Sequence, residues 1–234
     1  MRAKRGIFIT FEGLDGCGKT TQLARLKQTL VTRQLEVLAT REPGGSAIGE
    51  RIRSILLDSR TADLSPTAEL ALMFADRAQH VKEIIEPALR AGKIVLCDRY
   101  TDSTEAYQGH GRELGSQVVL SLHRDLCRDL WPDLTLLLDS GLDASVLRAR
   151  SRNRNANSFE GRFEEENAAF FRRVRKGFES IARRETSRVT KIPGGSMPEV
   201  ELKVLRVIEQ RFPQLATRAL ITGTRVQPRY EKRQ

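Results

Sequence analysis

Short runs of apolar residues alternate along the chain with longer segments in which apolar residues recur every three or four positions. The short runs predict five buried strands, at residues 6–12, 36–40, 93–97, 133–138 and 188–192. The periodic segments predict helices at residues 20–33, 65–91, 118–130, 143–150, 163–184 and 199–212. Because strands alternate with helices, we expect an α/β fold, a doubly wound parallel sheet of about five strands with helices on both faces.

Proline and glycine residues mark the limits of the longest predicted helix. Ser65 followed by Pro66 is typical of an N-cap and a first helical position. Gly92 predicts the end of that helix, and Pro87 is expected to kink or break it.

Composition and charge narrow the class of protein. The chain has 234 residues, of which 39% are hydrophobic, and a net charge of +10. This length suits a single domain over residues 1–212, followed by a basic and flexible tail over residues 213–234. The apolar runs are too short to span a bilayer, so we expect a cytoplasmic protein without a membrane partner. Much of the basic excess lies in residues 148–176 and 218–233, and nucleic acid is not an expected partner.

A glycine-rich segment between the first strand and the first helix carries the strongest chemical signal. It matches the G-x(4)-G-K-T pattern of a phosphate-binding loop, in which backbone N–H groups and a helix N-terminus surround phosphate oxygens. Lys19 is expected to reach the β- and γ-phosphates of ATP, and the Thr20 hydroxyl to bind Mg²⁺. The residues predicted to bind ATP are Gly13, Leu14, Asp15, Gly16, Cys17, Gly18, Lys19, Thr20 and Thr21.

A second group of charged residues follows the predicted strand at residues 93–97. Asp98 is placed like the carboxylate that supports Mg²⁺ in phosphate-loop enzymes, so Asp98 and Thr20 are the predicted metal ligands. Arg99, beside it, can hold a second phosphate by two parallel hydrogen bonds. Ligands of such folds bind at the carboxyl ends of the strands, and we expect both groups to meet there.

Four segments together resemble the thymidylate kinase family in order and spacing. They are residues 12–21, 40–45, 74–80 and 98–109, and the resemblance extends over residues 6–212. It implies the P-loop NTPase fold and transfer of a phosphoryl group from ATP to dTMP, giving dTDP and ADP for dTTP synthesis. It also implies Mg²⁺ as cofactor and a homodimer.

The resemblance assigns a second set of residues to the acceptor, dTMP. In the family, the residue matching Arg99 holds the dTMP phosphate and the one matching Arg77 binds the thymine ring. Residues matching Asp15 and Tyr107 face the sugar, where Tyr107 disfavours a 2′-hydroxyl. The full predicted set is Asp15, Glu42, Pro43, Met73, Phe74, Arg77, Arg99, Thr104, Tyr107 and Gln108. Family members usually stack an aromatic residue on thymine four positions before the arginine. Met73 stands there and Phe74 follows it, so the stacking residue stays open.

An arginine-rich segment resembles the lid of these kinases, which we place at residues 148–162. One subclass of the family carries a catalytic arginine in the phosphate-binding loop, but Cys17 stands in that loop here. The lid is therefore expected to supply the cation, and the predicted catalytic residues are Lys19, Arg99, Arg150 and Arg152. Gly161 replaces the usual aspartate before Arg162, which leaves the anchor of Arg162 open.

Two alternative functions remain at this point. The first is a kinase for another deoxynucleoside monophosphate or for a nucleoside, although Arg99 and Tyr107 favour a monophosphate with a deoxy sugar. The second is a P-loop ATPase linked to nucleic acid. A GTPase is disfavoured because the chain has no Asn-Lys-x-Asp segment to bind guanine.

Overall fold

The computed structural model describes residues 5–61, 63–141, 162–163 and 166–216. Its centre is a parallel sheet of five strands, β1 (Phe8–Glu12), β2 (Val37–Arg41), β3 (Ile94–Asp98), β4 (Leu134–Asp139) and β5 (Val189–Pro193). The strand order is β2-β3-β1-β4-β5. The chain thus builds one half of the sheet on each side of β1, and the predicted doubly wound α/β fold is confirmed.

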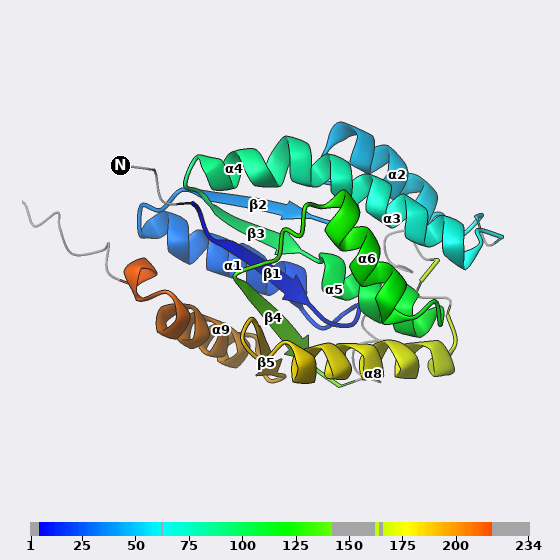
Figure 1. Ribbon diagram of the computed structural model, residues 1–234. Coiled ribbons are helices and arrows are strands. Elements are labelled where there is room, and N and C mark those ends of the chain that lie inside the picture. Colours follow the sequence, from blue (N-terminus) through cyan, green and yellow to red (C-terminus); the bar gives the residue numbers. More distant parts are fainter. Residues whose placement is uncertain (1–4, 62, 142–161, 164–165, 217–234) are drawn as a thin grey trace, which may run out of the picture.

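Helices cover both faces of this sheet (Figure 1). The described helical segments are α1 (Lys19–Thr32), α2 (Ala47–Leu57), α3 (Pro66–His80), η1 (Val81–Ile85), α4 (Glu86–Arg90), α5 (Thr101–Thr104), η2 (Glu105–Gly111), α6 (Ser116–Leu126), α8 (Ala168–Arg184), α9 (Met197–Arg211) and η3 (Pro213–Leu215). Helices α1 and α9 pack together on one face, while α3, α4, α6 and α8 lie on the other.

Alternating side chains of the strands explain these two layers. In β1, Ile9 and Phe11 pack against α1 and α9, whereas Phe8 points to the opposite face and packs against α3 and α4. The central strands β1, β3 and β4 are buried on both faces, as expected of a parallel sheet, and this is why they appear in the sequence as continuous apolar runs. The edge strands β2 and β5 are partly exposed.

Helix boundaries differ from the prediction in places that have local causes. Helix α8 begins at Ala168, not at Phe163, because the Asn167 side chain accepts a hydrogen bond from the Phe170 N–H and caps the helix there. The helical run continues past Pro87, which lies in the first turn of α4 after the π-helical turn η1. A missing N–H is tolerated at such a position.

The helical segments α2, α5, η2 and η3 were not predicted. Helix α2 is capped by Ser46, which accepts from the Gly49 N–H, and its apolar residues have helical spacing that would have revealed it. Segment η2 contains glycines that disfavour a helix locally, but it packs closely against α8. A Cβ on Gly111 would lie 2.6 Å from the Phe170 ring, so glycine is required for this approach. The predicted helix at residues 143–150 lies outside the described residues, as do most of the predicted lid and tail.

Candidate active site

A single large cleft of about 1440 Å³ lies at the carboxyl ends of the strands among the described residues. It is lined by the loop after β1, the ends of β2 and β3, and residues of α2, α3 and η2. Most of the predicted site residues line it, namely Asp15, Gly16, Cys17, Gly18, Lys19, Thr20, Thr21, Glu42, Pro43, Met73, Arg77, Asp98, Arg99, Thr104, Tyr107 and Gln108. Gly13, Leu14 and Phe74 do not line it, and Arg150 and Arg152 lie outside the described residues.

The loop between β1 and α1 has the geometry expected of a phosphate-binding loop. Gly13 has a φ of +131°, and a Cβ there would lie 2.4 Å from the Leu138 carbonyl oxygen, so only glycine fits. Lys19 starts α1, and its ammonium group donates to the carbonyl oxygens of Gly13 at 3.1 Å and Leu14 at 2.9 Å. The lysine thus folds back over its own loop, with the N-terminus of α1 behind it.

The two predicted metal ligands are adjacent in space. The Thr20 hydroxyl donates to Oδ2 of Asp98 at 2.6 Å, which joins the first turn of α1 to the end of β3. Both groups are hard oxygen donors at the mouth of the phosphate-binding loop. Mg²⁺ commonly binds one or two protein oxygens and completes its shell with water and phosphate oxygens, so this donor set fits the ion.

Arg99 forms the centre of a second charged cluster in the same cleft. Its guanidinium donates to Asp15 Oδ1 at 2.5 Å, to the Gly13 carbonyl oxygen at 3.1 Å and to Ser103 Oγ at 2.7 Å. The Tyr107 hydroxyl donates to the other carboxylate oxygen of Asp15 at 2.8 Å. Burial opposes ionisation of Asp15, but the charges of Arg99 and Lys19 outweigh it and hold the pKa of Asp15 below its usual range.

Arg77 forms a further buried cluster at the α3 side of the cleft. Its Nε donates to Glu42 Oε2 at 2.7 Å and its Nη2 to Thr104 Oγ1 at 2.9 Å, and its side chain is 2% exposed. His80 Nδ1 lies 2.9 Å from the second oxygen of Glu42. Burial opposes the charge of Glu42, but Arg77 and His80 outweigh it and lower the pKa of this carboxyl. Arg77 Nη1 is buried and has no hydrogen-bond partner among the described residues.

Met73 and Phe74 occupy different surroundings. Met73 is half-buried and lines the cleft. Phe74 is 1% exposed and packs in the core with Leu70 and Val95, where its ring lies 5.0 Å from the Arg77 guanidinium carbon. Of the two candidates for the stacking residue, only Met73 therefore lines the cleft.

Glu69 on α3 anchors several residues of the site. Its fully buried carboxylate accepts hydrogen bonds from Arg162 at 2.7 Å, from Gln108 at 2.7 Å and from Arg112. Arg162 also donates to the Leu56 carbonyl oxygen at 2.7 Å. The open question of the Arg162 anchor thus has an answer, because Glu69 and the Leu56 carbonyl oxygen hold the Arg162 guanidinium.

The predicted set lacks several residues that line the cleft, among them Arg53, Ser103 and Phe163. Arg53 Nη1 donates to the Pro43 carbonyl oxygen at 3.0 Å, and it lies on the unpredicted helix α2. The Phe163 ring packs edge-on against Tyr107 at 5.8 Å. Recognition of α2 would have pointed to Arg53, and Ser103 lies in the segment 98–109 that carries the family resemblance, whereas no local signal identifies Phe163.

Asp76 makes the stability of this region depend on pH. Its Oδ1 accepts from the Gly44 N–H at 3.0 Å, and burial, followed by the charge of Glu42, raises the pKa of Asp76 from 3.8 to about 7. The native state therefore binds more protons than the unfolded state in this range, and ionisation of Asp76 lowers the free energy of unfolding as the pH rises from 3.8 to about 7.

An Asp76→Asn variant keeps the acceptor oxygen and removes the charge. We expect its free energy of unfolding to rise relative to the wild type, by on the order of 2 kcal/mol, between about pH 4 and pH 8. Urea unfolding of both proteins across this pH range measures the difference in their free energies of unfolding. Other titrating groups contribute equally to both proteins and do not affect this difference. Parallel pH curves for the two proteins would contradict the assignment.

Comparisons with known proteins agree with this geometry. The model of the thymidylate kinase family matches residues 11–202. The thymidylate kinase of Desulfovibrio desulfuricans is 49% identical over 195 residues, covering 82% of this chain and 90% of the relative. The thymidylate kinase of Geobacter sulfurreducens is 46% identical over 210 residues, covering 89% of this chain and 99% of the relative.

A solved structure gives the same result for the fold. The crystal structure of thymidylate kinase from Ehrlichia chaffeensis superposes with a TM-score of 0.70 at 33% identity, covering 88% of this chain and 99% of that one. The predicted P-loop NTPase fold is thereby confirmed. With a family match over most of its length and relatives at nearly half identity, the chain belongs to the thymidylate kinase family.

Proposed function

We propose that the protein transfers the γ-phosphoryl group of ATP to dTMP, which gives dTDP and ADP and supplies dTTP synthesis. The observation that carries this proposal is that the phosphate-binding loop with Lys19 and the cluster around Arg99 open onto one cleft. A cationic site for a second phosphate beside the ATP phosphates is what transfer between two nucleotides requires.

In the donor half of the cleft, the backbone of residues 13–21 surrounds the ATP phosphates and Lys19 turns from its loop carbonyls towards them. Thr20 and Asp98 would hold Mg²⁺ against the same phosphates. When bound, the ion neutralises charge that develops on the transferred group. The Thr20 hydroxyl and the Asp98 carboxylate are already 2.6 Å apart, and this closeness supports their assignment to the same ion.

In the acceptor half, Arg99 exchanges its contact with Asp15 for the phosphate of dTMP, and Asp15 is left to accept from the sugar hydroxyl. Arg77, Thr104 and Gln108 bind the thymine ring. Two buried atoms of this set, Arg77 Nη1 and Gln108 Oε1, have no hydrogen-bond partner among the described residues, and such atoms carry a cost that a partner removes. Glu42 and Pro43 form a wall of this pocket, and Met73 covers the base.

The chemistry needs no protein base or covalent intermediate. The phosphate of dTMP is ionised at neutral pH and attacks the γ-phosphoryl group directly, so the protein contributes positioning and neutralisation of negative charge. Lys19 and Arg99 supply two of these charges. We assign the others to Arg150 and Arg152 of the proposed lid, on the basis of the family resemblance.

Tyr107 is expected to select deoxyribose by its bulk. Its ring is buried against Phe163, Phe170 and Phe178, so its position is held by packing as well as by the hydrogen bond to Asp15. Tyr107→Phe should therefore still discriminate against the ribonucleotide of thymine. Tyr107→Ala should relax that discrimination by about tenfold or more in kcat/KM. The kcat/KM of each variant for the two nucleotides is the measurement, and equal discrimination by both variants would place sugar selection elsewhere.

The proposed function is tested by ADP release with dTMP, dUMP, dCMP, AMP and thymidine as acceptors. Preference for dTMP is expected. Preference for another monophosphate or for thymidine would favour the alternative kinases, and release stimulated by DNA without any acceptor would favour a nucleic-acid-linked ATPase. Omission of Mg²⁺ in the same assay should abolish turnover.

Among the residues that the structure describes, no helix is long and apolar enough to cross a membrane. We propose a homodimer because of the family resemblance, and a cytoplasmic location because the apolar runs of the sequence are too short to span a bilayer. Light scattering of the purified protein tests the homodimer.

A further inference from the structure

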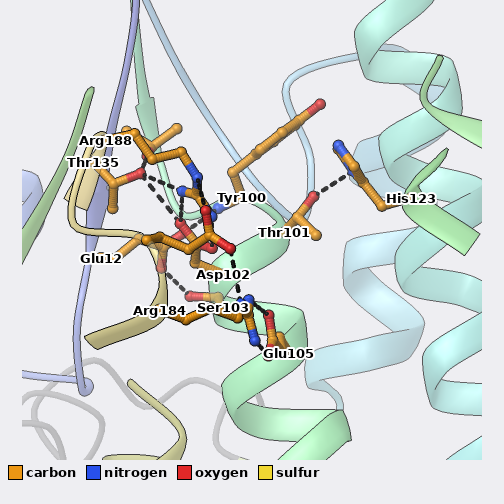
Figure 2. A network of polar contacts seen from close by, with 12 residues as sticks. Glu12, Tyr100, Thr101, Asp102, Ser103, Glu105, His123, Thr135, Arg184 and Arg188 are labelled. Atoms are coloured by element: carbon orange, nitrogen blue, oxygen red, sulfur yellow. Dashed lines mark hydrogen bonds and ion pairs between the residues drawn. The ribbon is translucent and has the colours of Figure 1, made fainter. Parts of the chain in front are cut away.

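Glu12 is the last residue of β1 and stands immediately before the phosphate-binding loop. Its side chain is fully buried, and each of its carboxyl oxygens accepts one hydrogen bond. The Tyr100 N–H donates to Oε1 at 2.7 Å, and the Ser103 hydroxyl donates to Oε2 at 2.5 Å. Both donors belong to the segment after β3 that also carries Arg99, so Glu12 ties the end of β1 to that segment (Figure 2).

Arg99 has a backbone conformation that needs such support. Its φ is +70°, in the left-handed region that residues with a Cβ rarely occupy. Two backbone hydrogen bonds hold this turn. The Arg99 N–H donates to the Phe11 carbonyl oxygen at 3.0 Å, and the next N–H, that of Tyr100, donates to the Glu12 carboxylate. The second of them depends on the Glu12 side chain.

The side chain of Arg99 is also linked to Glu12. Its Nη1 donates to Ser103 Oγ at 2.7 Å. A guanidinium only donates and a hydroxyl has a single hydrogen, so Ser103 accepts from Arg99 and gives its hydrogen to Glu12. The direction of this relay is therefore determined, and it requires an acceptor oxygen on Glu12.

We infer that Glu12 is a positioning residue for the acceptor phosphate, which holds Arg99 through Ser103 and the Tyr100 N–H with its guanidinium at the cleft. The inference rests on the proposed function, in which Arg99 binds the phosphate of dTMP. Glu12 itself does not line the cleft and acts through Arg99.

A neighbouring ion pair supports Glu12 in this role. Asp102 is 2% exposed and receives two hydrogen bonds from Arg188 at the start of β5, at 2.7 and 2.8 Å (Figure 2). Arg188 thus compensates Asp102, the charged group that most disfavours ionisation of Glu12. Burial, followed by the charge of Asp102, still raises the pKa of Glu12 to about 8, while Ser103, Arg99 and the Tyr100 N–H favour its ionised form. Carboxyl groups with such raised pKa values are concentrated at functional sites.

The inference is tested by calorimetric binding of dTMP and of thymidine, which lacks the phosphate, at a pH of about 8.5, above the pKa of Glu12. Glu12→Gln keeps the shape of the side chain but cannot accept from both donors. It should weaken dTMP binding by about tenfold and leave thymidine binding unchanged, since only the phosphate contact depends on Arg99.

Glu105→Gln is the matched control. Glu105 is also fully buried after β3, but its carboxylate pairs with Arg184 and has no contact with Arg99 (Figure 2). This variant should bind both ligands as the wild type does. Ser103→Ala interrupts the relay with Glu12 in place and should reproduce the selective loss, which keeps the test valid if Glu12→Gln does not fold.

The outcomes separate this inference from the function on which it rests. Arg99→Ala should abolish the preference for dTMP over thymidine. Suppose that Arg99→Ala abolishes this preference, but Glu12→Gln and Ser103→Ala both bind dTMP normally or lose affinity for dTMP and thymidine equally. The positioning role of Glu12 is then wrong, and the proposed function stands. If Arg99→Ala retains the full preference for dTMP, the assignment of Arg99 fails and the inference fails with it.

Discussion

A Lys19→Ala variant is expected to fold normally and to lose roughly two orders of magnitude or more in turnover. Lys19 is the only cationic side chain in the loop of residues 13–21. Lys19 is 6% exposed, and its ammonium group lies over the carbonyl oxygens of Gly13 and Leu14. From there we expect a change of side-chain rotamer to bring it to the phosphate oxygens. Charge stabilisation in a site shielded from water is worth far more than in solution, which explains the size of the expected loss.

Lys27→Ala is the matched control for this experiment. Lys27 lies on the same helix, α1, but is exposed to solvent away from the loop, so its replacement should leave turnover unchanged. Steady-state ADP release gives the turnover of both variants, and circular dichroism with thermal unfolding shows that they are folded. Normal turnover in a folded Lys19→Ala protein would contradict the assignment of the phosphate-binding loop.

The second large effect is expected from the arginines at residues 148, 150, 152 and 154. Cys17 occupies a loop position in which part of the family carries a catalytic arginine, and another cation must then reach the transferred group. We predict that Arg150→Ala or Arg152→Ala lowers turnover by up to roughly three orders of magnitude. The KM for ATP should stay within a few-fold, because the charge acts mainly in the transition state.

Four single alanine variants, assayed at saturating dTMP, test this prediction. One or two of them should lose turnover, and the others serve as controls for the removal of a surface arginine, which by itself changes almost nothing. If all four variants keep normal turnover, these arginines form only a solvated surface. The catalytic cation would then have to be another residue, of which Arg53 is the first to examine because it lines the cleft.

Features with a local physical cause were predictable from the sequence. The central strands β1, β3 and β4 are continuous apolar runs because they are buried on both faces of the parallel sheet, and all five strands were located to within two residues. The phosphate-binding loop was predictable from its glycines, because positions such as Gly13 have a backbone conformation and close contacts that no other residue can adopt. Thr20, in the first turn of α1 just after the loop that follows β1, and Asp98, at the end of β3, were expected to meet because parallel strands direct their carboxyl ends to one edge.

Features that depend on pairs of residues far apart in the chain were decided only by the tertiary structure. Glu69 lies 93 positions from Arg162, and no periodicity of the sequence links the two. Met73 and Phe74 are adjacent on one helix, and only the packing of α3 against the sheet turns one to the cleft and the other to the core. The short helical stretch after β3 is disfavoured by its own glycines and forms because α8 packs closely on it.

The same distinction applies to Glu12. In the sequence Glu12 is an acidic residue at the end of an apolar strand, directly before Gly13, and nothing nearby indicates its partners. Its partners, Tyr100 and Ser103, lie about ninety positions away and are brought to it by the pairing of β1 with β3. Local sequence thus determined the strands, the loop and the classes of chemistry. Long-range packing decided which side chain holds which, because hydrogen-bond partners of buried groups are selected by the whole fold.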